Sequence, residues 1–503
     1  MTPITLTNPL YWTDIPDVDV IRVNDMFYMI STSMHTMPGC PIMKSVNLRD
    51  WEIVSYVFDK LEDNQEHYLI EKKGIYGQGS WAASLRYEND TYYVCFSSND
   101  MKKFYIYQTD DIEKGEWKRS EIDGIYHDPA LLFDGGRVFV IYGCGDIKIV
   151  ELTEDVTQLK ESGINQILLQ TPTDNIGLRC EGCHAYYING YYYLLFIEWP
   201  TNGNERRRQI CYRSKSLLGK YERKIIFDDD FGYKNKGIAQ GAIFDTQAGD
   251  WYAMLFQDHD AVGRIPYILP VQWKDNWPMI GVDGKTPEQI ELQLPNAITS
   301  PIVISDEFHY TDNALSLQWQ WNHNPMNECW SLTERNDHLR LRTSRVVENV
   351  LEAPNTLTQR TEGPTCEARI KIDCTNMQIG DVAGLIALQS NFGTVGIKKM
   401  DENHFEIQMT KSKQNQNEVI IDRKEFATPI LYLKIRFQYE DSIDQATFYW
   451  SDNEVEWNNI GDILQMKYTL DHFMGYRIGI FNYATEVIGG HVDIDYFRYK
   501  KIK

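Results

Sequence analysis

Hydrophobic and polar positions follow one pattern that repeats five times over the first half of the chain. In each copy an apolar strand is followed by a polar turn containing Asn, Asp or Gly, and then by a second strand rich in aromatic and aliphatic residues. Turns of this composition join two antiparallel strands into a β-hairpin. The copies cover residues 20–34, 84–99, 130–145, 185–200 and 242–258.

Further strand-like stretches, such as residues 104–109 and 209–214, lie between these copies. Each repeat then holds about four strands, which is the content of one blade of a β-propeller. Five repeats therefore predict a five-bladed β-propeller, which we place over residues 1–296.

The residues directly before each hairpin are more polar than a packed core requires. The segments are PDV, SWA, HDP, CEG and AQG, with Asp17, Trp81, Asp128, Glu181 and Gln240 at their centres. Equivalent positions of a propeller converge on its central axis, so these side chains are expected to face one pocket. Burying an unpaired carboxylate is costly, and packing alone would not select acids at three of five positions. The alternative is a solvated acid at the start of each strand.

The pattern changes after Pro301. A Trp-rich stretch at residues 317–321 is followed by many short strands that continue to residues 493–499, and helical periodicity is scarce throughout. This predicts an all-β chain whose second domain, residues 303–503, is a β-sandwich of jelly-roll, concanavalin-like type. The linker is expected near residues 294–301.

Composition and charge narrow the range of ligands. The chain has 503 residues, enough for two domains, and its 50 basic against 72 acidic residues give a net charge of −22. This charge disfavours nucleic acid and anionic membranes as partners. The 31 Tyr and 13 Trp suit the apolar faces of sugars, although β-sheet propensity explains them equally well. A neutral ligand is the simplest expectation.

The first residues, MTPITLTNPLYW, contain neither a basic segment nor an apolar core of secretory length, and no apolar run reaches the roughly 18 residues that span a bilayer. We therefore expect a cytoplasmic protein, unless a leader has been removed. Nine scattered cysteines argue for reduced thiols rather than a disulfide framework. Cys180 and Cys183 form one C-x-x-C without a second pair, which favours structural thiols over a metal or redox site.

Three carboxyl groups at one pocket suit hydrolysis of a glycosidic bond. That reaction uses one carboxylic acid to protonate the leaving oxygen and one carboxylate to activate water or attack directly. A third carboxylate can raise the pKa of the acid, because like charges disfavour ionisation. Glu181 is the candidate acid because its side chain is longer and its neighbours are small or apolar. The residues alone do not rank the three roles.

Several short strings closely resemble glycoside hydrolase family 43, in the family's order and at blade positions. They are PDVDVIRV (16–23), PGCPIMKS (38–45), LRDWE (48–52), DPA (128–130), EGCH (181–184), FQDHDAVGRIP (256–266) and WPMIG (277–281). The strings at 305–308 and 318–325 (QWQWNHNP) resemble the sandwich domain of the β-xylosidase and α-L-arabinofuranosidase branch.

The resemblance implies roles for the three acids. Asp17 would be the general base and Glu181 the general acid of an inverting single displacement. Asp128 would be the orienting residue, and it would modulate the pKa of the acid. The enzyme would release terminal xylose or arabinofuranose from hemicellulose oligosaccharides without a required cofactor. We favour β-xylosidase with arabinofuranosidase side activity over a predominant arabinofuranosidase.

The resemblance also implies substrate contacts. Arg264 would hydrogen-bond sugar hydroxyls with its rigid fork, and a surface ion pair is the alternative. Trp81 would form an aromatic wall, or simply pack in the propeller, and His35 would lie in a loop that shapes the sugar pocket. Gln240 completes the predicted set of contacts.

Two positions differ from the family's pattern, and two further predictions concern a calcium site and the closure of the pocket. Ala239 stands where many relatives have a His linked to a central calcium, and Cys183 stands where they have Pro, so a propeller-bound metal is in doubt. In the sandwich, Asp306, Glu307 and Asp495 could hold a structural calcium, with plain surface acids as the alternative. Residues 481–490 are expected to close the propeller mouth, which favours removal of one terminal sugar.

Two other functions would fit part of this sequence pattern. A retaining fructosidase such as an invertase would also use this propeller and two acids, but its Asn-Asp-Pro-Asn-Gly and Arg-Asp-Pro strings are replaced here by PDVD and HDP. A non-catalytic glycan-binding protein would not need all three acids. Whether the chain forms a homo-oligomer stays open.

Overall fold

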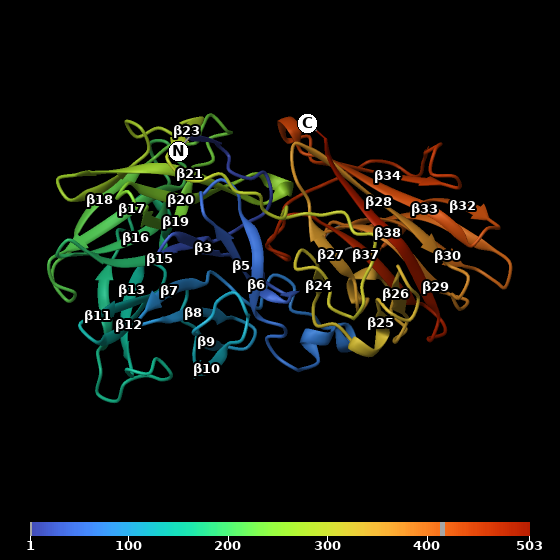
Figure 1. The fold of residues 1–503 in the computed structure, drawn as a ribbon, viewed down its shortest axis with the longest axis horizontal. Helices are drawn as coiled ribbons and strands as arrows, with labels where there is room; N and C mark the ends of the chain where they lie inside the picture. The colour runs from blue at the N-terminus through green and yellow to red at the C-terminus, as the bar shows by residue number, and fades with distance from the viewer. Residues whose placement is uncertain (1–2, 413–417, 503) are drawn as a thin grey trace.

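The computed structural model describes residues 3–412 and 418–502, which form two β-rich bodies (Figure 1). The N-terminal body, coloured blue to green, contains five four-stranded antiparallel sheets, and the C-terminal body is a two-sheet sandwich in yellow to red. The predicted fold class, a five-bladed propeller followed by a concanavalin-like sandwich, is confirmed.

Each predicted hairpin forms the first two strands of one blade. The blades are β2 (Asp19–Val23), β3 (Met26–Ile30), β5 (Gly39–Ser45) and β6 (Glu52–Phe58); β7 (Ser84–Glu88), β8 (Thr91–Ser98), β9 (Lys103–Thr109) and β10 (Lys118–Asp123); β11 (Ala130–Asp134), β12 (Arg137–Tyr142), β13 (Asp146–Leu152) and β14 (Asn165–Gln170); β15 (Ile176–Ile188), β16 (Tyr191–Pro200), β17 (Arg208–Ser214) and β18 (Glu222–Phe227); and β19 (Ala239–Asp245), β20 (Trp251–Asp258), β21 (Arg264–Lys274) and β22 (Trp277–Ile280).

The first strand of each blade lies at the centre of the propeller. These strands contact one another in the order β2, β7, β11, β15 and β19, and β19 returns to β2, so the ring is closed. Residues that directly precede them are thereby brought to one end of the central channel. A separate pair, β1 (Ile4–Thr7) with β23 (Gln289–Leu292), joins the start of the propeller to the segment that follows the last blade.

The hairpin of the fourth blade is longer than the sequence pattern indicated. The pattern begins at Ala185, whereas β15 starts at Ile176 and pairs with β16 through Leu178 opposite Trp199 and Glu181 opposite Ile197. The pairing register shifts three times before His184. Such irregularities re-aim side chains and are frequent beside functional sites. They also hide the strand from a search for strict alternation.

The sandwich consists of two packed antiparallel sheets. One has the order β32 (Val419–Phe426), β31 (Phe405–Lys411), β30 (Gly393–Lys399), β29 (Asp381–Leu388), β37 (Arg477–Ala484), β27 (Leu357–Arg360), β24 (Gln320–Asn322) and β4 (Thr36–Met37). The other has the order β25 (Trp330–Ser331), β26 (Leu339–Arg342), β38 (His491–Ile502), β28 (Thr365–Asp373), β33 (Ile430–Gln438), β34 (Gln445–Ser451) and β35 (Asn458–Asn459), with β36 (Leu464–Gln465) also pairing with β34. In β28 and β33 buried residues alternate with partly exposed ones, as expected when one face covers a core.

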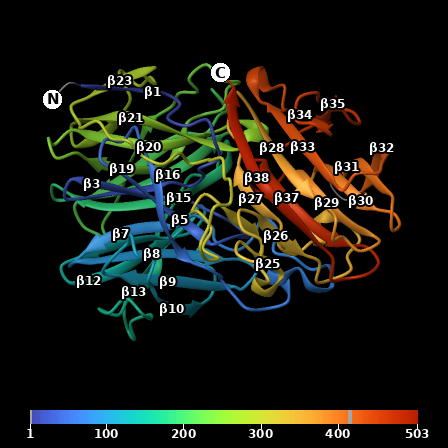
Figure 2. The same ribbon diagram turned by 45° about the vertical axis from the view of Figure 1, so that its right-hand side comes forward.

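The two bodies share a sheet. Strand β4 belongs in sequence to the first blade but pairs with β24 of the sandwich, Met37 opposite Trp321. The Oγ1 of Thr13 donates to the carbonyl of Thr361 at 2.8 Å, and further backbone bonds cross the same interface. The turned view in Figure 2 also places the two bodies against each other. The sandwich is therefore built into the propeller rather than tethered to it.

The helices among the described residues are three-residue 3₁₀ turns, and none is long and apolar enough to cross a membrane.

Candidate active site

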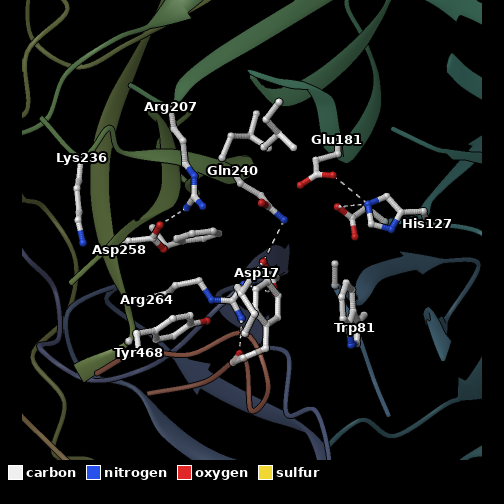
Figure 3. Close-up of a pocket in the computed structure, with 18 of the residues that line it drawn as sticks. Asp17, Trp81, His127, Glu181, Arg207, Lys236, Gln240, Asp258, Arg264 and Tyr468 are labelled. Atoms are coloured by element: carbon white, nitrogen blue, oxygen red, sulfur yellow. Dashed lines mark hydrogen bonds and ion pairs between the residues drawn. The ribbon is translucent and has the colours of Figure 1, made fainter. Parts of the chain in front are cut away.

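The residues predicted at the start of the five hairpins gather in one pocket, three of them just before an inner strand and two, Glu181 and Gln240, within β15 and β19. Asp17, Trp81, Asp128, Glu181 and Gln240 all line a cavity of about 230 Å³ at the propeller axis (Figure 3). The cavity lies below the roughly 300–1,000 Å³ of pockets for drug-sized ligands, so it suits a small molecule. The five side chains therefore converge on one pocket, as the sequence repeat predicts.

Asp17 is held by two neighbours from the fifth blade. The Nη1 of Arg264, at the start of β21, donates to both carboxylate oxygens at 2.8 and 2.9 Å, and the Nε2 of Gln240 donates to Oδ1 at 3.1 Å. Hydrogen bonds between charged groups are shorter and stronger than neutral ones. Because Asp17 and Arg264 are both buried, this pair fixes the orientation of the carboxylate toward the pocket.

Three of the five pocket residues have unusual backbone conformations. Asp17, Asp128 and Gln240 have φ values of 51°, 45° and 65°. For a residue with a side chain, such a conformation costs of order 1–3 kcal/mol and tends to occur at functional sites. The positive φ values indicate that the direction of these side chains toward the pocket matters more than a relaxed backbone conformation.

Asp128 and Glu181 are neighbours, joined by a histidine. The Nε2 of His127 lies 3.1 Å from Oε2 of Glu181 and 3.6 Å from Oδ2 of Asp128, and the backbone N–H of Gly182 donates to Asp128 at 2.9 Å. Burial raises the pKa of Asp128 to about 6, with help from the nearby charges of Glu181 and Asp17, while His127 acts against it. The three carboxyl groups therefore influence one another.

The pKa of His127 is raised in this setting. Burial lowers its pKa, but the charges of Asp128 and Glu181 outweigh burial and raise the pKa to about 9. Sequence reasoning assigned it no role. Its only signal was its place beside Asp128 in the HDP segment.

The sandwich supplies one wall of the pocket. Tyr468, Leu470 and Phe473 line it, and residues 468–473, which we call the mouth segment, connect β36 to β37. The ring of Phe473 stacks on Trp81 at 5.2 Å and lies 4.8 Å from the Arg264 guanidinium. The prediction that residues 481–490 close the mouth is wrong. Phe481 belongs to β37, a buried inner strand of the sandwich, so it is not available to the propeller.

His35 does not line the pocket, contrary to expectation. Its side chain is fully buried at the interface between propeller and sandwich, with its ring 4.7 Å from that of Tyr76 and 4.9 Å from that of His323. The next two residues form β4, whose pairing with β24 draws His35 toward the sandwich. A two-residue strand that pairs across almost 300 positions leaves no local signal in the sequence.

The predicted calcium ligands do not come together. Asp306 accepts hydrogen bonds from Tyr310 and Trp319, Glu307 pairs with Arg498 at 2.8 Å, and Asp495 pairs with Lys371 at 2.6 Å. Over residues 3–412 and 418–502, the one group of His, Cys, Asp and Glu close enough to hold a metal is His127, Asp128 and Glu181. The sandwich acids instead serve as ordinary acceptors for local donors.

Two charged pairs at the pocket were not predicted. Arg207 pairs with Asp258, and Lys236 pairs with Asp260. All four side chains line the cavity beside Arg264. The run of three arginines at 206–208 was the available sequence signal, but nothing in the run indicates which arginine faces the pocket.

Comparison with known families and proteins agrees with this architecture. Residues 6–278 match the model described as "Glycosyl hydrolases family 43", and residues 305–500 match "Beta xylosidase C-terminal Concanavalin A-like domain". A β-xylosidase of Formosa agariphila is 27% identical over 98% of this chain and 90% of its own length. A non-reducing end α-L-arabinofuranosidase of Bacteroides ovatus is 25% identical over 84% of this chain and 78% of its own length.

A solved structure of a bifunctional GH43-CE protein of Bacteroides eggerthii has 40% sequence identity and a TM-score of 0.93. The match covers 100% of this chain and 64% of the other, so this chain spans less than two thirds of that bifunctional protein.

Proposed function

The chain belongs to family 43 of the glycosyl hydrolases and is a glycoside hydrolase, and from this premise we propose that it removes one terminal pentose, β-D-xylose or α-L-arabinofuranose, from hemicellulose oligosaccharides. The observation that carries the proposal is the closed pocket, where Asp17 and the Asp128–Glu181 pair lie around a cavity of about 230 Å³. A pocket closed on one side by the mouth segment admits a chain end more readily than the middle of a polymer.

In the proposed reaction Asp17 is the general base. Its carboxylate, oriented by Arg264 and Gln240, takes a proton from the water that attacks the anomeric carbon. Glu181 donates a proton to the leaving oxygen, and Asp128 is the neighbouring carboxyl group that modulates the pKa of this acid. Arg264 also faces the pocket, where its guanidinium can donate to hydroxyls of the bound sugar.

The relatives include both a β-xylosidase and an α-L-arabinofuranosidase. We favour β-xylosidase activity with arabinofuranosidase side activity, because the two sugars can present similarly placed hydroxyls to the same pocket.

The first test compares initial rates on p-nitrophenyl β-D-xyloside and α-L-arabinofuranoside for the wild type and Glu181→Ala. Loss of the proton donor is expected to lower kcat by about 10²–10⁴-fold. Glu222→Ala, which removes an exposed carboxylate of the same blade, should retain the wild-type rate. A Glu181→Ala variant within a few-fold of the wild type would refute the assignment, and the ratio of wild-type rates identifies the preferred sugar.

The stereochemical outcome tests the single displacement separately. When hydrolysis of the β-xyloside is followed by proton NMR, an inverting enzyme releases α-xylose first, and the β-anomer appears only through mutarotation. Initial release of β-xylose would instead indicate a retaining reaction with a covalent intermediate. The arabinofuranoside gives an independent reading, because inversion of its α-linkage releases the β-anomer.

A further inference from the structure

Six basic residues gather on the outer face of the sandwich. Along β28 and β33 buried residues alternate with partly exposed ones, so every second side chain points away from the core. Strand β38 pairs with β28, which pairs in turn with β33 (Figure 1). We call the basic residues at outward positions of these three strands the basic face: Arg369, Lys371, Lys434, Arg436, Arg498 and Lys500.

Three of these cations lie directly opposite one another. Arg369 of β28 is paired in register with Lys434 of β33 on one side and with Arg498 of β38 on the other. Like charges at opposite positions of neighbouring strands destabilise a sheet. Glu454 offsets part of this cost, because it lies 3.4 Å from Arg369 and 3.2 Å from Arg498. A row of cations that costs stability indicates a use in binding rather than in folding.

The central strand holds two cations without an anionic partner. Among the residues that the structure describes, neither Lys434 nor Arg436 forms an ion pair, and the Nε of Arg436 is buried without a hydrogen-bond acceptor. Burial lowers the pKa of Lys434. Glu367 acts against this effect, whereas Arg369 and Arg436 add to it. A bound anion would relieve the repulsion between these neighbouring charges.

Aromatic rings lie among the basic residues. The Nζ of Lys434 is 4.6 Å from the ring of Tyr449 and 4.2 Å from that of Trp457. Tyr432 precedes Lys434 by two residues and therefore shares its face of the sheet. All three rings are partly exposed. They can pack against the apolar faces of sugars, which a site for a simple inorganic anion would not need.

The spacing of free charges distinguishes between polyanions. Nucleic acid carries a negative charge about every 1.7 Å, and a protein with a net charge of −22 repels it. A neutral sugar chain with occasional carboxylates is repelled less, and its carboxylates make charge-assisted hydrogen bonds to ammonium and guanidinium groups. We propose that the basic face binds a hemicellulose polysaccharide that carries uronic acid side groups, with its carboxylates on Lys434 and Arg436 and its sugar rings against Tyr449 and Trp457.

This inference rests on the proposed function for the main chain of the polymer, and it adds a second site to that function. No residue of the basic face lines the pocket at the propeller axis. The sandwich would therefore hold the polysaccharide while the propeller removes its terminal sugars.

Affinity electrophoresis in gels that contain glucuronoxylan tests the basic face. For the double variant Lys434→Gln and Arg436→Gln, the Kd is expected to rise about tenfold, which corresponds to about 1.4 kcal/mol for two charged contacts. Glucuronoxylan whose carboxyl groups have been reduced to alcohols should bind the wild type about tenfold more weakly than the untreated polymer, because the charged acceptors are gone.

The matched control removes two other positive charges. Lys118 and Lys220 are exposed lysines of the propeller, and the double variant Lys118→Gln and Lys220→Gln should bind glucuronoxylan like the wild type. Both double variants should keep the wild-type rate on the aryl pentosides, which shows that they are folded. If the variant of the basic face loses this rate, Lys500→Gln takes its place, because Lys500 is exposed, and an approximately threefold rise in Kd is expected.

Three results would overturn the proposal. The first is equal binding of the untreated and the reduced polymer by the wild type, and the second is wild-type affinity in the variant of the basic face. The third is binding of single-stranded DNA as tight as that of glucuronoxylan, since the face would then attract any polyanion.

The rates on aryl pentosides separate this proposal from the proposed function. A wild type that hydrolyses them but does not bind glucuronoxylan keeps the pentosidase proposal and loses the polysaccharide site. A wild type that hydrolyses neither pentoside but binds the untreated polymer through the basic face gives the opposite result.

Discussion

His127 shows how one residue can change the properties of an acid pair. Its imidazole contacts Glu181 and lies close to Asp128, and the charge of Asp17 also acts on it. The remaining titratable neighbour of Glu181 is the Cys144 thiol, whose pKa burial and Glu181 raise to about 12, so it stays neutral. In the proposed reaction His127, whose pKa is raised to about 9, therefore lies one hydrogen bond from the carboxyl group that donates the proton.

Replacing His127 should therefore shift the pH dependence of catalysis. Because the pKa of His127 is raised to about 9, the imidazole is expected to lose its proton only as the pH rises through 9. His127→Phe and His127→Gln remove this titrating group, so the alkaline limb of kcat/KM is expected to move to lower pH. The measurement is a pH profile of xyloside or arabinofuranoside hydrolysis between pH 5 and 10.

The two variants separate proton supply from positioning. Gln can still donate a hydrogen bond to Glu181, so it should keep more of the wild-type rate near pH 6 than Phe does, while both show the shifted limb. An alkaline limb unchanged from the wild type in both variants would mean that His127 only packs against the pocket.

At the scale of strands, the propeller axis is held together by a buried arginine. Arg86 of β7 donates through Nη1 to Asp19 of β2 at 2.7 Å, through Nε to the carbonyl of Leu131 on β11 at 3.1 Å, and through Nη2 to that of Ala185 on β15 at 3.4 Å. One side chain thus links the inner strands of four blades. A charge with so little exposure is tolerated because it is paired with Asp19 and each guanidinium nitrogen donates at least one hydrogen bond.

Arg86 bears on whether a metal could occupy the same axis. Asp19 is already neutralised by the guanidinium, and the candidate ligand group found among residues 3–412 and 418–502 does not include it. The guanidinium of Arg86 therefore already supplies a positive charge beside Asp19.

At the scale of the whole molecule, the sequence predicts those strands and site residues that short stretches of the chain indicate by their own pattern. Alternating strands and turn residues indicated all five blade hairpins, and equivalent repeat positions brought Asp17, Asp128 and Glu181 to one pocket. His35 and the mouth segment were misjudged or missed for a shared reason. Each depends on where distant strands meet, as in the pairing of β4 with β24, and such long-range contacts leave no periodicity in the chain.

The interface between propeller and sandwich contains buried neutral histidines. His472 of the mouth segment stacks on Tyr76 at 4.2 Å, and His35 and His323 lie beside the same ring. Burial lowers the pKa of His472 to about 3, and those of His35 and His323 fall well below the usual value for the same reason. An unfolded chain would take up these protons near pH 6.5. Stability is therefore full above pH 6.5 and is lost as the pH falls toward the folded-state pKa.

Replacing His472 by Phe should remove its share of this acid sensitivity while keeping the stacked ring. Between pH 7 and pH 5 the wild type is expected to lose about 2 kcal/mol of unfolding free energy that His472→Phe does not lose. Urea unfolding at the two pH values measures the difference. Asp381 and Asp444, whose pKa values burial raises to about 6, act in the opposite direction but cancel in the comparison.

The exposed His404 provides the control for this experiment. Asp401 raises its pKa, so His404→Gln should not protect the protein against acid. If His472→Phe loses as much stability as the wild type between pH 7 and pH 5, the histidine is not neutral in the folded interface. Because Phe473 follows His472 directly and lines the pocket, a protective effect would also show that part of the acid sensitivity lies in the segment that the sandwich contributes to the active site.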